Sequence, residues 1–164
     1  MQSTVVRTRA GTLAIRSLRN GDTATVQAVF DQLGEESRRL RFGKATPRLA
    51  LKELSELARV DGLHHVLVGT IGGIPVGIAR LVRDAEKRHL ADVAYAVADD
   101  WQRRGIGTAL MRALISDAAV AGITHVRADI RLENDASLSL LKKATNIVSR
   151  RVVGGEIAVV ALTT

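Results

Sequence analysis

The fold of this chain is decided by the stretch Gln102-Arg103-Arg104-Gly105-Ile106-Gly107, which separates an apolar run over residues 93–98 from an amphipathic segment over residues 105–121. Glycines at positions 105 and 107 remove side chains where the chain turns from a strand into a helix. Successive backbone N–H groups can then point outward at an anion, and the positive end of the helix dipole adds to the attraction. The stretch therefore predicts a phosphate-binding loop whose ligand carries a pyrophosphate.

Two common nucleotide loops do not fit this stretch. A dinucleotide-binding fingerprint needs a third glycine, and Leu110 occupies that position. A P-loop needs Gly-Lys-Ser/Thr after its second glycine, whereas Gly107 is followed by Thr108-Ala109. The stretch is therefore either another class of phosphate loop or an ordinary tight strand-to-helix turn.

The chain resembles the GNAT superfamily of N-acetyltransferases from residue 13 to its end, and within it the bacterial protein lysine acetyltransferase branch. The loop matches the Gln/Arg-x-x-Gly-x-Gly pattern of the superfamily. Residues 91–107 are similar to the acyl-CoA-binding segment of that branch, and residues 35–42 to its Ser-Arg-x-x-Arg-Phe segment. Glu133-Asn134, before a short helix, is a third match. Three matches in chain order are far more specific than the loop alone.

Length and composition limit the architecture. With 164 residues, 46% of them hydrophobic, the chain is long enough for one core and too short for two comfortable domains. We expect one domain over residues 1–164, with residues 1–11 as a flexible or edge segment. There is no cysteine, which excludes disulfides and thiolate chemistry. No apolar run reaches the roughly 18 residues of a membrane span and no signal peptide is evident, so we expect a cytoplasmic protein without a membrane partner.

The net charge of +7 raises the question of an acidic partner. Binders of single-stranded nucleic acid stack bases on aromatic platforms, and the few aromatic side chains here are scattered. No helix-turn-helix, zinc-finger or RNA-binding signature is present, so we expect no nucleic-acid partner. The densest basic stretch, residues 38–48, holds five cations. We interpret it mainly as a solvated helix face, with CoA phosphates or an acidic substrate as alternatives.

Hydrophobic periodicity predicts the element order β-α-α-β-β-β-α-β-α-β-β. Strands are expected over residues 13–18, 66–71, 76–82, 90–98, 126–130, 147–153 and 157–162, and helices over residues 20–33, 47–62, 105–121 and 136–144. Glycine pairs at positions 72–73 and 154–155 suit tight hairpin turns. The predicted fold class is α/β (α+β): the GNAT-like mixed, mostly antiparallel central sheet with helices on both faces. The apolar last strand leaves open a homodimer paired along its edge.

The resemblance implies direct transfer of an acetyl group from acetyl-CoA to a primary amine, either a protein lysine or a small molecule. A lysine amine with a pKa near 10.4 is neutral only about one time in a thousand at physiological pH, so a base would help. Asp92 is the candidate, at the position of a glutamate in the branch and beside the small Ala94 and Ala96. An aspartate is one methylene shorter and would need a bridging water. We expect burial to raise its pKa; the alternative is an exposed or salt-bridged strand carboxylate.

The resemblance also implies the residues that hold acetyl-CoA. They are Val97, Gln102, Arg103, Arg104, Gly105, Ile106, Gly107, Thr108 and Asn134. The backbone N–H of Val97 is expected to hold the pantetheine arm as an added strand and to polarise the thioester. Asn134 also suits the cap of the following helix, a role compatible with cofactor contact.

Two positions depart from the family pattern. Leu141 stands where many members have a tyrosine that protonates the departing thiolate, so water is expected to supply that proton. Thr145-Asn146 replaces a Gly-Phe pair, which leaves the final turn and part of the acceptor pocket unpredicted. The missing tyrosine and the shortened carboxylate of Asp92 support a second hypothesis, a CoA-binding regulatory module without catalysis. Neighbouring histidines at 64 and 65 point to opposite faces of a strand, and we expect no metal site.

Overall fold

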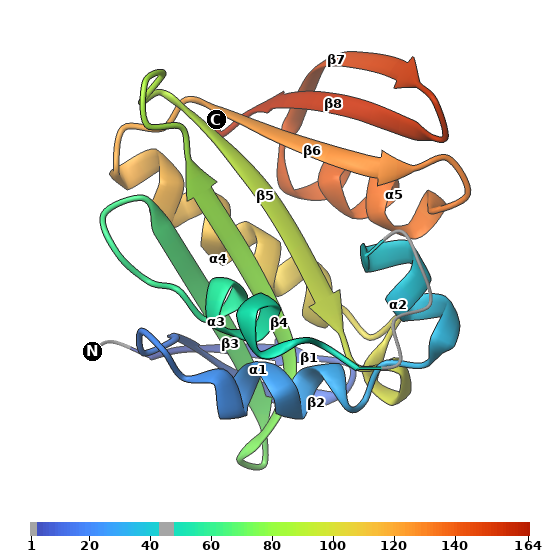
Figure 1. The fold of residues 1–164 in the computed structure, drawn as a ribbon. Helices are drawn as coiled ribbons and strands as arrows, with labels where there is room; N and C mark the ends of the chain where they lie inside the picture. The colour runs from blue at the N-terminus through green and yellow to red at the C-terminus, as the bar shows by residue number, and fades with distance from the viewer. Residues whose placement is uncertain (1–2, 43–47) are drawn as a thin grey trace.

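A computed structural model of the protein describes residues 3–42 and 48–164; Pro47, where a helical run was expected to open, lies outside these ranges. The described residues form one sheet with the strand order β1-β2-β3-β4-β5-β6-β8-β7 (Figure 1). Its strands are β1 (Thr4–Thr8), β2 (Gly11–Ser17), β3 (His64–Ile71), β4 (Ile74–Arg83), β5 (Leu90–Val97), β6 (His125–Arg131), β7 (Asn146–Val153) and β8 (Glu156–Leu162). The helices are α1 (Thr23–Phe30), α2 (Glu35–Phe42), α3 (Leu51–Leu57), α4 (Ile106–Val120) and α5 (Asp135–Ala144), with a 3-10 turn η1 (Asp99–Trp101).

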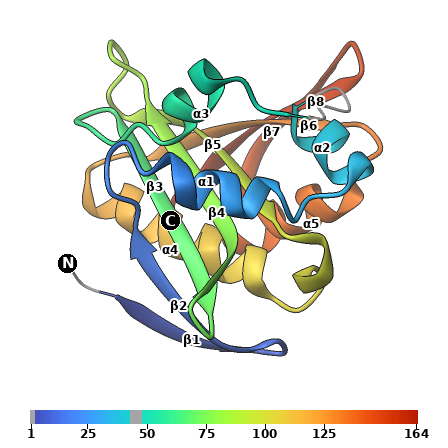
Figure 2. The same ribbon diagram turned by 60° about the horizontal axis from the view of Figure 1, so that its bottom comes forward.

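Helices cover both faces of the sheet. α4 packs against β2, β3, β4 and β5 on one face, and α1 packs against β4 and α3 on the other (Figures 1 and 2). Neighbouring strands are antiparallel except β5 and β6, which run parallel. The predicted fold class, a mixed and mostly antiparallel sheet between helices, is confirmed.

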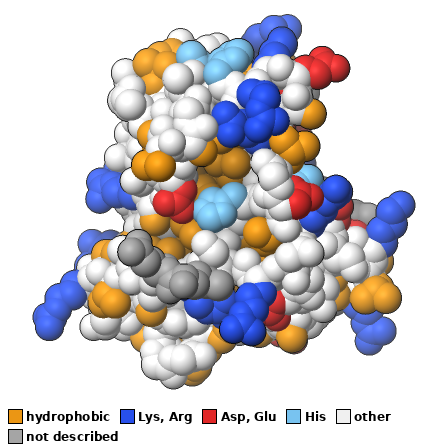
Figure 3. All heavy atoms as spheres, turned by 90° about the vertical axis from the view of Figure 1, so that its left-hand side faces the viewer, with side chains coloured by type: hydrophobic (Ala, Val, Ile, Leu, Met, Phe, Trp, Pro, Cys, Tyr) orange, Lys and Arg blue, Asp and Glu red, His pale blue; other side chains and the backbone are white. Residues whose placement is uncertain are grey.

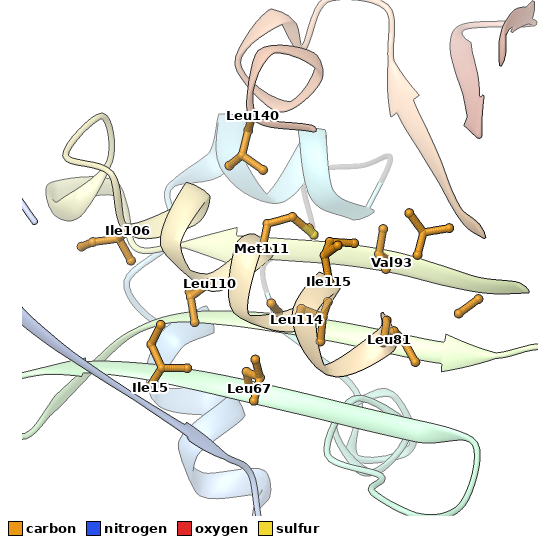
Figure 4. Close-up of a cluster of buried hydrophobic side chains, with 14 of the residues drawn as sticks. Ile15, Leu67, Leu81, Val93, Ile106, Leu110, Met111, Leu114, Ile115 and Leu140 are labelled. Atoms are coloured by element: carbon orange, nitrogen blue, oxygen red, sulfur yellow. The ribbon is translucent and has the colours of Figure 1, made fainter. Parts of the chain in front are cut away.

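The main core lies between α4 and the sheet. Its members include Leu110, Met111, Leu114 and Ile115 of α4 and Leu67, Leu81 and Val93 of the strands (Figure 4). Each large aliphatic side chain buried here contributes about 1.5–3 kcal/mol. Gly77 lets the helix approach closely, because a Cβ atom there would lie 2.8 Å from Leu110 Cδ1. This layer anchors the end of β5 and the start of α4, where the phosphate loop was predicted.

Two elements differ from the sequence prediction at the N-terminal end. Residues 4–8, expected to be flexible or at an edge, form the edge strand β1, which pairs with β2. Residues 35–42 were absent from the predicted element order, although residues 38–48 were interpreted mainly as a solvated helix face; they form α2, which has no buried residue and therefore no apolar stripe to reveal it. Glu35 and Glu36 in its first turn and Arg39 and Arg41 in its last complement the helix dipole.

The last strand does not supply the dimer edge that the sequence left open, because β8 lies between β6 and β7 and pairs with both. The outer edge is β7, and its valines at 148, 152 and 153 are all more than half exposed. β8 is the more apolar strand because it is the interior one.

Surface charge is dispersed on the face seen in Figure 3. Lys and Arg side chains are distributed around this face, with acidic and hydrophobic side chains between them. Within the described ranges, no helix is long and apolar enough to cross a bilayer.

Candidate functional site

The site is a cleft that opens where β5 and β6 part. The two strands are paired only from Leu90 to Asp92 on β5, opposite His125 to Arg127 on β6. Beyond these pairs they diverge, with α2 at the open end (Figure 1). The cleft has a volume of about 730 Å³ and is lined by β5, the loop before α4, β6, the start of α5, and α2. This volume is within the range of small-molecule and cofactor sites.

The predicted phosphate loop has an unusual backbone. Gly105 precedes α4 with a φ of +89°, and Arg103 has a φ of +61°, the only positive φ of a non-glycine residue in the described parts of the chain. Left-handed residues of this kind cluster at functional sites, where they turn neighbouring N–H groups to one side. No side chain caps α4. The first N–H groups of the helix are thus free for an anion.

Arg9, in the turn between β1 and β2, braces this loop and also lines the cleft. Its guanidinium Nη2 donates to the carbonyl of Arg103 at 3.1 Å, and its backbone N–H donates to that of Arg104 at 3.2 Å. Arg9 was not among the predicted site residues, because its contact joins positions 94 residues apart and depends on strand β1.

Gln102 is exposed, and its side-chain amide holds the loop in place. Its Nε2 donates to the carbonyl of Val97 at 2.9 Å and to Ser37 Oγ of α2 at 3.2 Å. Ser37 Oγ in turn donates to Asp99 Oδ1 at 2.7 Å. The side-chain amide of Gln102 therefore connects β5, α2 and the loop. Ser37, a residue of the segment similar to the acetyltransferase branch, was not among the predicted site residues.

The edge of β5 beyond Asp92 is open towards the cleft. Ala98 N–H donates to Val76 of β4 at 2.8 Å, and successive backbone groups of a strand point in opposite directions. The N–H of Val97 therefore points away from β4, towards the cleft. An extended chain lying in the cleft can hydrogen-bond to this edge as an added strand.

The start of α5 forms the opposite wall. Asn134 Oδ1 accepts a hydrogen bond from Ser137 N–H at 3.1 Å, so the predicted helix cap is present. Ser137 Oγ lies 2.9 Å from the hydroxyl of Tyr95 on β5, and burial raises the pKa of that hydroxyl. A Cβ on Gly107 would lie 2.8 Å from Leu140 Cδ1 and 3.1 Å from Tyr95 Cε2, so this glycine serves close packing of α4 against α5 and β5. Leu141 is 3% exposed.

Asp92 does not line the cleft: it lies on the last residue pair that joins β5 to β6, one residue before Val93, where the lining of the cleft begins on β5. Its side chain is 60% exposed, so the expected burial is wrong. Both carboxylate oxygens accept from Arg127, at 2.9 Å from Nε and 3.3 Å from Nη2, and this pairing raises the pKa of Arg127. The residue opposite in the parallel register supplies the partner. Asp92 therefore has the geometry of the salt-bridged alternative, on the same strand face as Ala94 and Ala96.

An ionic contact spans the cleft between α2 and the loop after β6. Arg39 Nη1 lies 2.6 Å from Glu133 Oε1, and Arg39 Nη2 lies 2.7 Å from Glu36 Oε1. The hydrogen bond from Arg39 lowers the pKa of Glu133 to about 2. Glu36 and Glu133 both line the cleft, so this contact sits at its mouth.

Most of the predicted cofactor residues converge on the cleft. Those that line it are Val97, Gln102, Arg103, Gly105, Gly107, Thr108 and Asn134. Ile106 instead points into the core and is 1% exposed, while the Arg104 guanidinium lies 5.8 Å from the centre of the Trp101 ring. In the ranges that the structure covers, no cluster of His, Cys, Asp or Glu has the geometry to hold a metal ion.

Comparison with known proteins identifies the family. Residues 28–145 match the model of the acetyltransferase (GNAT) family. The chain belongs to that family. Acetyltransferase Pat of Mycolicibacterium smegmatis is 34% identical over 119 residues, which cover 71% of this chain and 35% of the relative. The chain thus spans about a third of the length of this curated relative.

Solved structures share the fold of this chain. The GNAT domain of S. lividans PAT superimposes with a TM-score of 0.87 at 24% identity, over 98% of this chain and 96% of that one. A cAMP-binding acyltransferase from Mycobacterium smegmatis has a TM-score of 0.67 at 27% identity, over 99% of this chain and 48% of that one. A third, yncA from Salmonella typhimurium with its cofactor acetyl-CoA, has a TM-score of 0.67 at 17% identity, over 92% of both chains. The family prediction is confirmed, and the sequence similarity to Acetyltransferase Pat agrees with the predicted branch.

Proposed function

We propose that this chain is an N-acetyltransferase that moves the acetyl group of acetyl-CoA to a primary amine, with a protein lysine as one acceptor class. The observation that carries the proposal is the open edge of β5, which runs directly into the uncapped N-terminus of α4. One wall thus offers N–H donors to an extended amide chain and, at its end, to a pyrophosphate. This is the sequence of groups along coenzyme A. We propose that residues 1–164 form one catalytic unit, since every wall of the cleft is built on a single sheet and the elements packed against it.

Several residues would hold the cofactor, which supplies the acetyl group as a reactive thioester. The N–H groups of residues 105–108 and the guanidinium of Arg103 would bind the pyrophosphate, with Arg9 keeping the loop in position. The N–H of Val97 would bind the extended arm. Gln102 acts as a positioning residue, because its amide hydrogen-bonds to protein groups.

Asp92 is proposed to accept the proton of the acceptor ammonium through a bridging water. It is on the strand face of Ala94 and Ala96, whose small side chains leave room for an acceptor. Arg127 would fix the orientation of the carboxylate, and its exposure allows water to reach the oxygens. Leu141 has no proton to give, so the thiolate would take its proton from solvent.

The cofactor test uses Thr108, the third residue of α4, which lines the cleft. A glutamate at this position is favourable for the helix itself, because it complements the dipole. It would nevertheless repel a pyrophosphate at the same N–H groups. Thr108→Glu should therefore abolish acetyl-CoA binding measured by calorimetry, with the melting temperature retained. Thr108→Gln, which introduces a side chain of the same shape as glutamate without its charge, should keep micromolar-range binding of acetyl-CoA. Equal affinity in both variants, or none in the wild type, refutes the proposed cofactor site.

A second function is a CoA-binding regulatory module without catalysis. The ion pair that engages both oxygens of Asp92 and the absence of an acid at Leu141 favour it. Acetyl-CoA binding that Thr108→Glu abolishes, without transfer to any amine in a panel of peptides and small amines, would select this module over the enzyme.

A further inference from the structure

A second, smaller cavity adjoins the cleft on the face of β4 and β5 that carries α1 and α3. Its volume is about 30 Å³, and its walls are apolar side chains of α1, α2, α3 and the strands. Ala94, Tyr95, Ala96, Leu33 and Arg41 line both hollows, so the cavity lies directly beside the cleft along β5. None of the residues predicted from the sequence to bind the cofactor lines it.

Two arginines are the charged members of this wall. Arg80 of β4 lies directly opposite Ala94 in the β4–β5 register, and Arg41 comes from the last turn of α2. Burial lowers the pKa of both guanidinium groups, that of Arg41 to about 10, and the positive charge of Arg80 adds to the shift of Arg41. Both remain protonated at neutral pH. Two cations therefore share a small hollow with apolar walls.

The protein neutralises Arg80 only in part, through one long ion pair with Glu56, and it gives Arg41 no carboxylate partner among the described residues. Arg80 Nε is buried without a hydrogen-bond partner, and Arg80 Nη2 reaches Glu56 only at 3.4 Å from Oε1 and 3.3 Å from the carbonyl. Arg41 lies 5.0 Å from the centre of the Phe42 ring and pairs with no carboxylate among the described residues. Residues 43–47 contain no Asp or Glu. Leaving buried donors and like charges unmatched is costly, and an anion removes the cost.

We propose that Arg41 and Arg80 form a subsite for a carboxylate group carried by the amine acceptor. This inference rests on the proposed acetyl transfer and names the class of acceptor. A water needs roughly 10–15 Å³ of cavity volume, so the cavity accommodates about two water-sized groups, the size of the two oxygens of a carboxylate. Guanidinium forks match the two carboxylate oxygens.

The position of the subsite also sets the length of the acceptor. Arg80 is level with Ala94, three residues before Val97, and three residues of a strand span roughly 10 Å. The arginine side chain covers part of that distance. The amine and the carboxylate should therefore be separated by several bonds, as in 4-aminobutyrate or in a lysine side chain next to an acidic residue of a peptide.

The experiment compares acceptors that differ only in the carboxylate. Acetyl transfer by the full chain is measured with 4-aminobutyrate against butylamine, and with a lysine peptide flanked by glutamate against the same peptide flanked by glutamine. The two pairs distinguish a free amino acid from a protein source. We expect at least a tenfold higher kcat/KM for an anionic acceptor over its neutral counterpart in the wild type. That ratio should fall towards one in Arg80→Gln and in Arg41→Gln. Arg150→Gln, on the exposed strand β7, is the control with the same change of charge.

Equal use of anionic and neutral acceptors by the wild type overturns the subsite while leaving the acetyltransferase proposal intact. A preference that survives in both variants, with unchanged melting temperatures, also overturns it. If nothing is acetylated, calorimetry of 4-aminobutyrate against the CoA-saturated protein decides. The subsite is supported, even though the proposed reaction has failed, if 4-aminobutyrate binds with millimolar affinity, butylamine does not bind, and Arg80→Gln abolishes the binding. Absence of 4-aminobutyrate binding overturns the subsite. The comparison of anionic with neutral acceptors on the wild-type protein does not depend on whether any variant folds.

Discussion

Two substitutions, one at Asp92 and one at its partner Arg127, distinguish a catalytic role of the Asp92 carboxylate from a structural one. Both Asp92→Asn and Arg127→Gln break the same ion pair, but only the first removes a proton acceptor. The side chains are 60% and 40% exposed, so the pair should contribute about 0–1 kcal/mol to stability. Each variant should therefore shift the free energy of unfolding by less than about 1 kcal/mol.

The two variants should differ in turnover. If Asp92 accepts the acceptor's proton through a water, Asp92→Asn should lower kcat by about 10²-fold or more, the usual range for general-base catalysis. It should also remove the acidic limb of the kcat profile. Arg127→Gln should keep kcat within a few-fold, because the carboxylate remains on the same strand position. The KM for acetyl-CoA should change little in either variant.

Denaturant titration and initial-rate assays over a range of pH measure both quantities. The proposed role of Asp92 is refuted if Asp92→Asn retains wild-type kcat and an unchanged pH profile. It is equally refuted if Arg127→Gln slows turnover as much as Asp92→Asn, because the ion pair itself would then be the required feature.

Two further predictions concern stability. Gly107→Val should lower the free energy of unfolding by about 1–3 kcal/mol, because its Cβ would meet Leu140 at 2.8 Å. Gly105→Asn should cost about 1 kcal/mol or less, because no atom lies within 4 Å of a Cβ at this position and asparagine tolerates a left-handed backbone. Equal losses of stability in denaturant titration would contradict the packing argument. The bond from Arg39 places the pKa of Glu133 at about 2 in the folded protein, below its ordinary 4.5, so its contribution is complete above pH 4.5 and is lost as pH falls towards 2. The melting temperature of Glu133→Gln should therefore converge on that of the wild type over this interval, and parallel curves would count against the contact.

Local pattern was sufficient for much of the fold. Periodicity located α4, α5 and the strands of the central sheet, because their apolar faces repeat at intervals that a core requires. Special residues marked boundaries as predicted: Asn134 caps α5, and Gly72 and Gly73 adopt positive φ in the turn between β3 and β4. The helix α2 was missing from the predicted element order because it has no buried residue, and contacts from Ser37 to Asp99 and from Arg39 to Glu133 hold it.

The sequence by itself determined the family, the strand–loop–helix unit and the residues available to bind an anion, since these depend on neighbours along the chain. Only the tertiary structure decided what those residues face. It paired Asp92 with Arg127, turned Ile106 into the core, brought Arg9 to the loop, and set Arg41 beside Arg80. Each of these outcomes depends on strand register or helix docking between distant segments. Because the energies of many weak contacts set that geometry together, no local pattern in the chain records it.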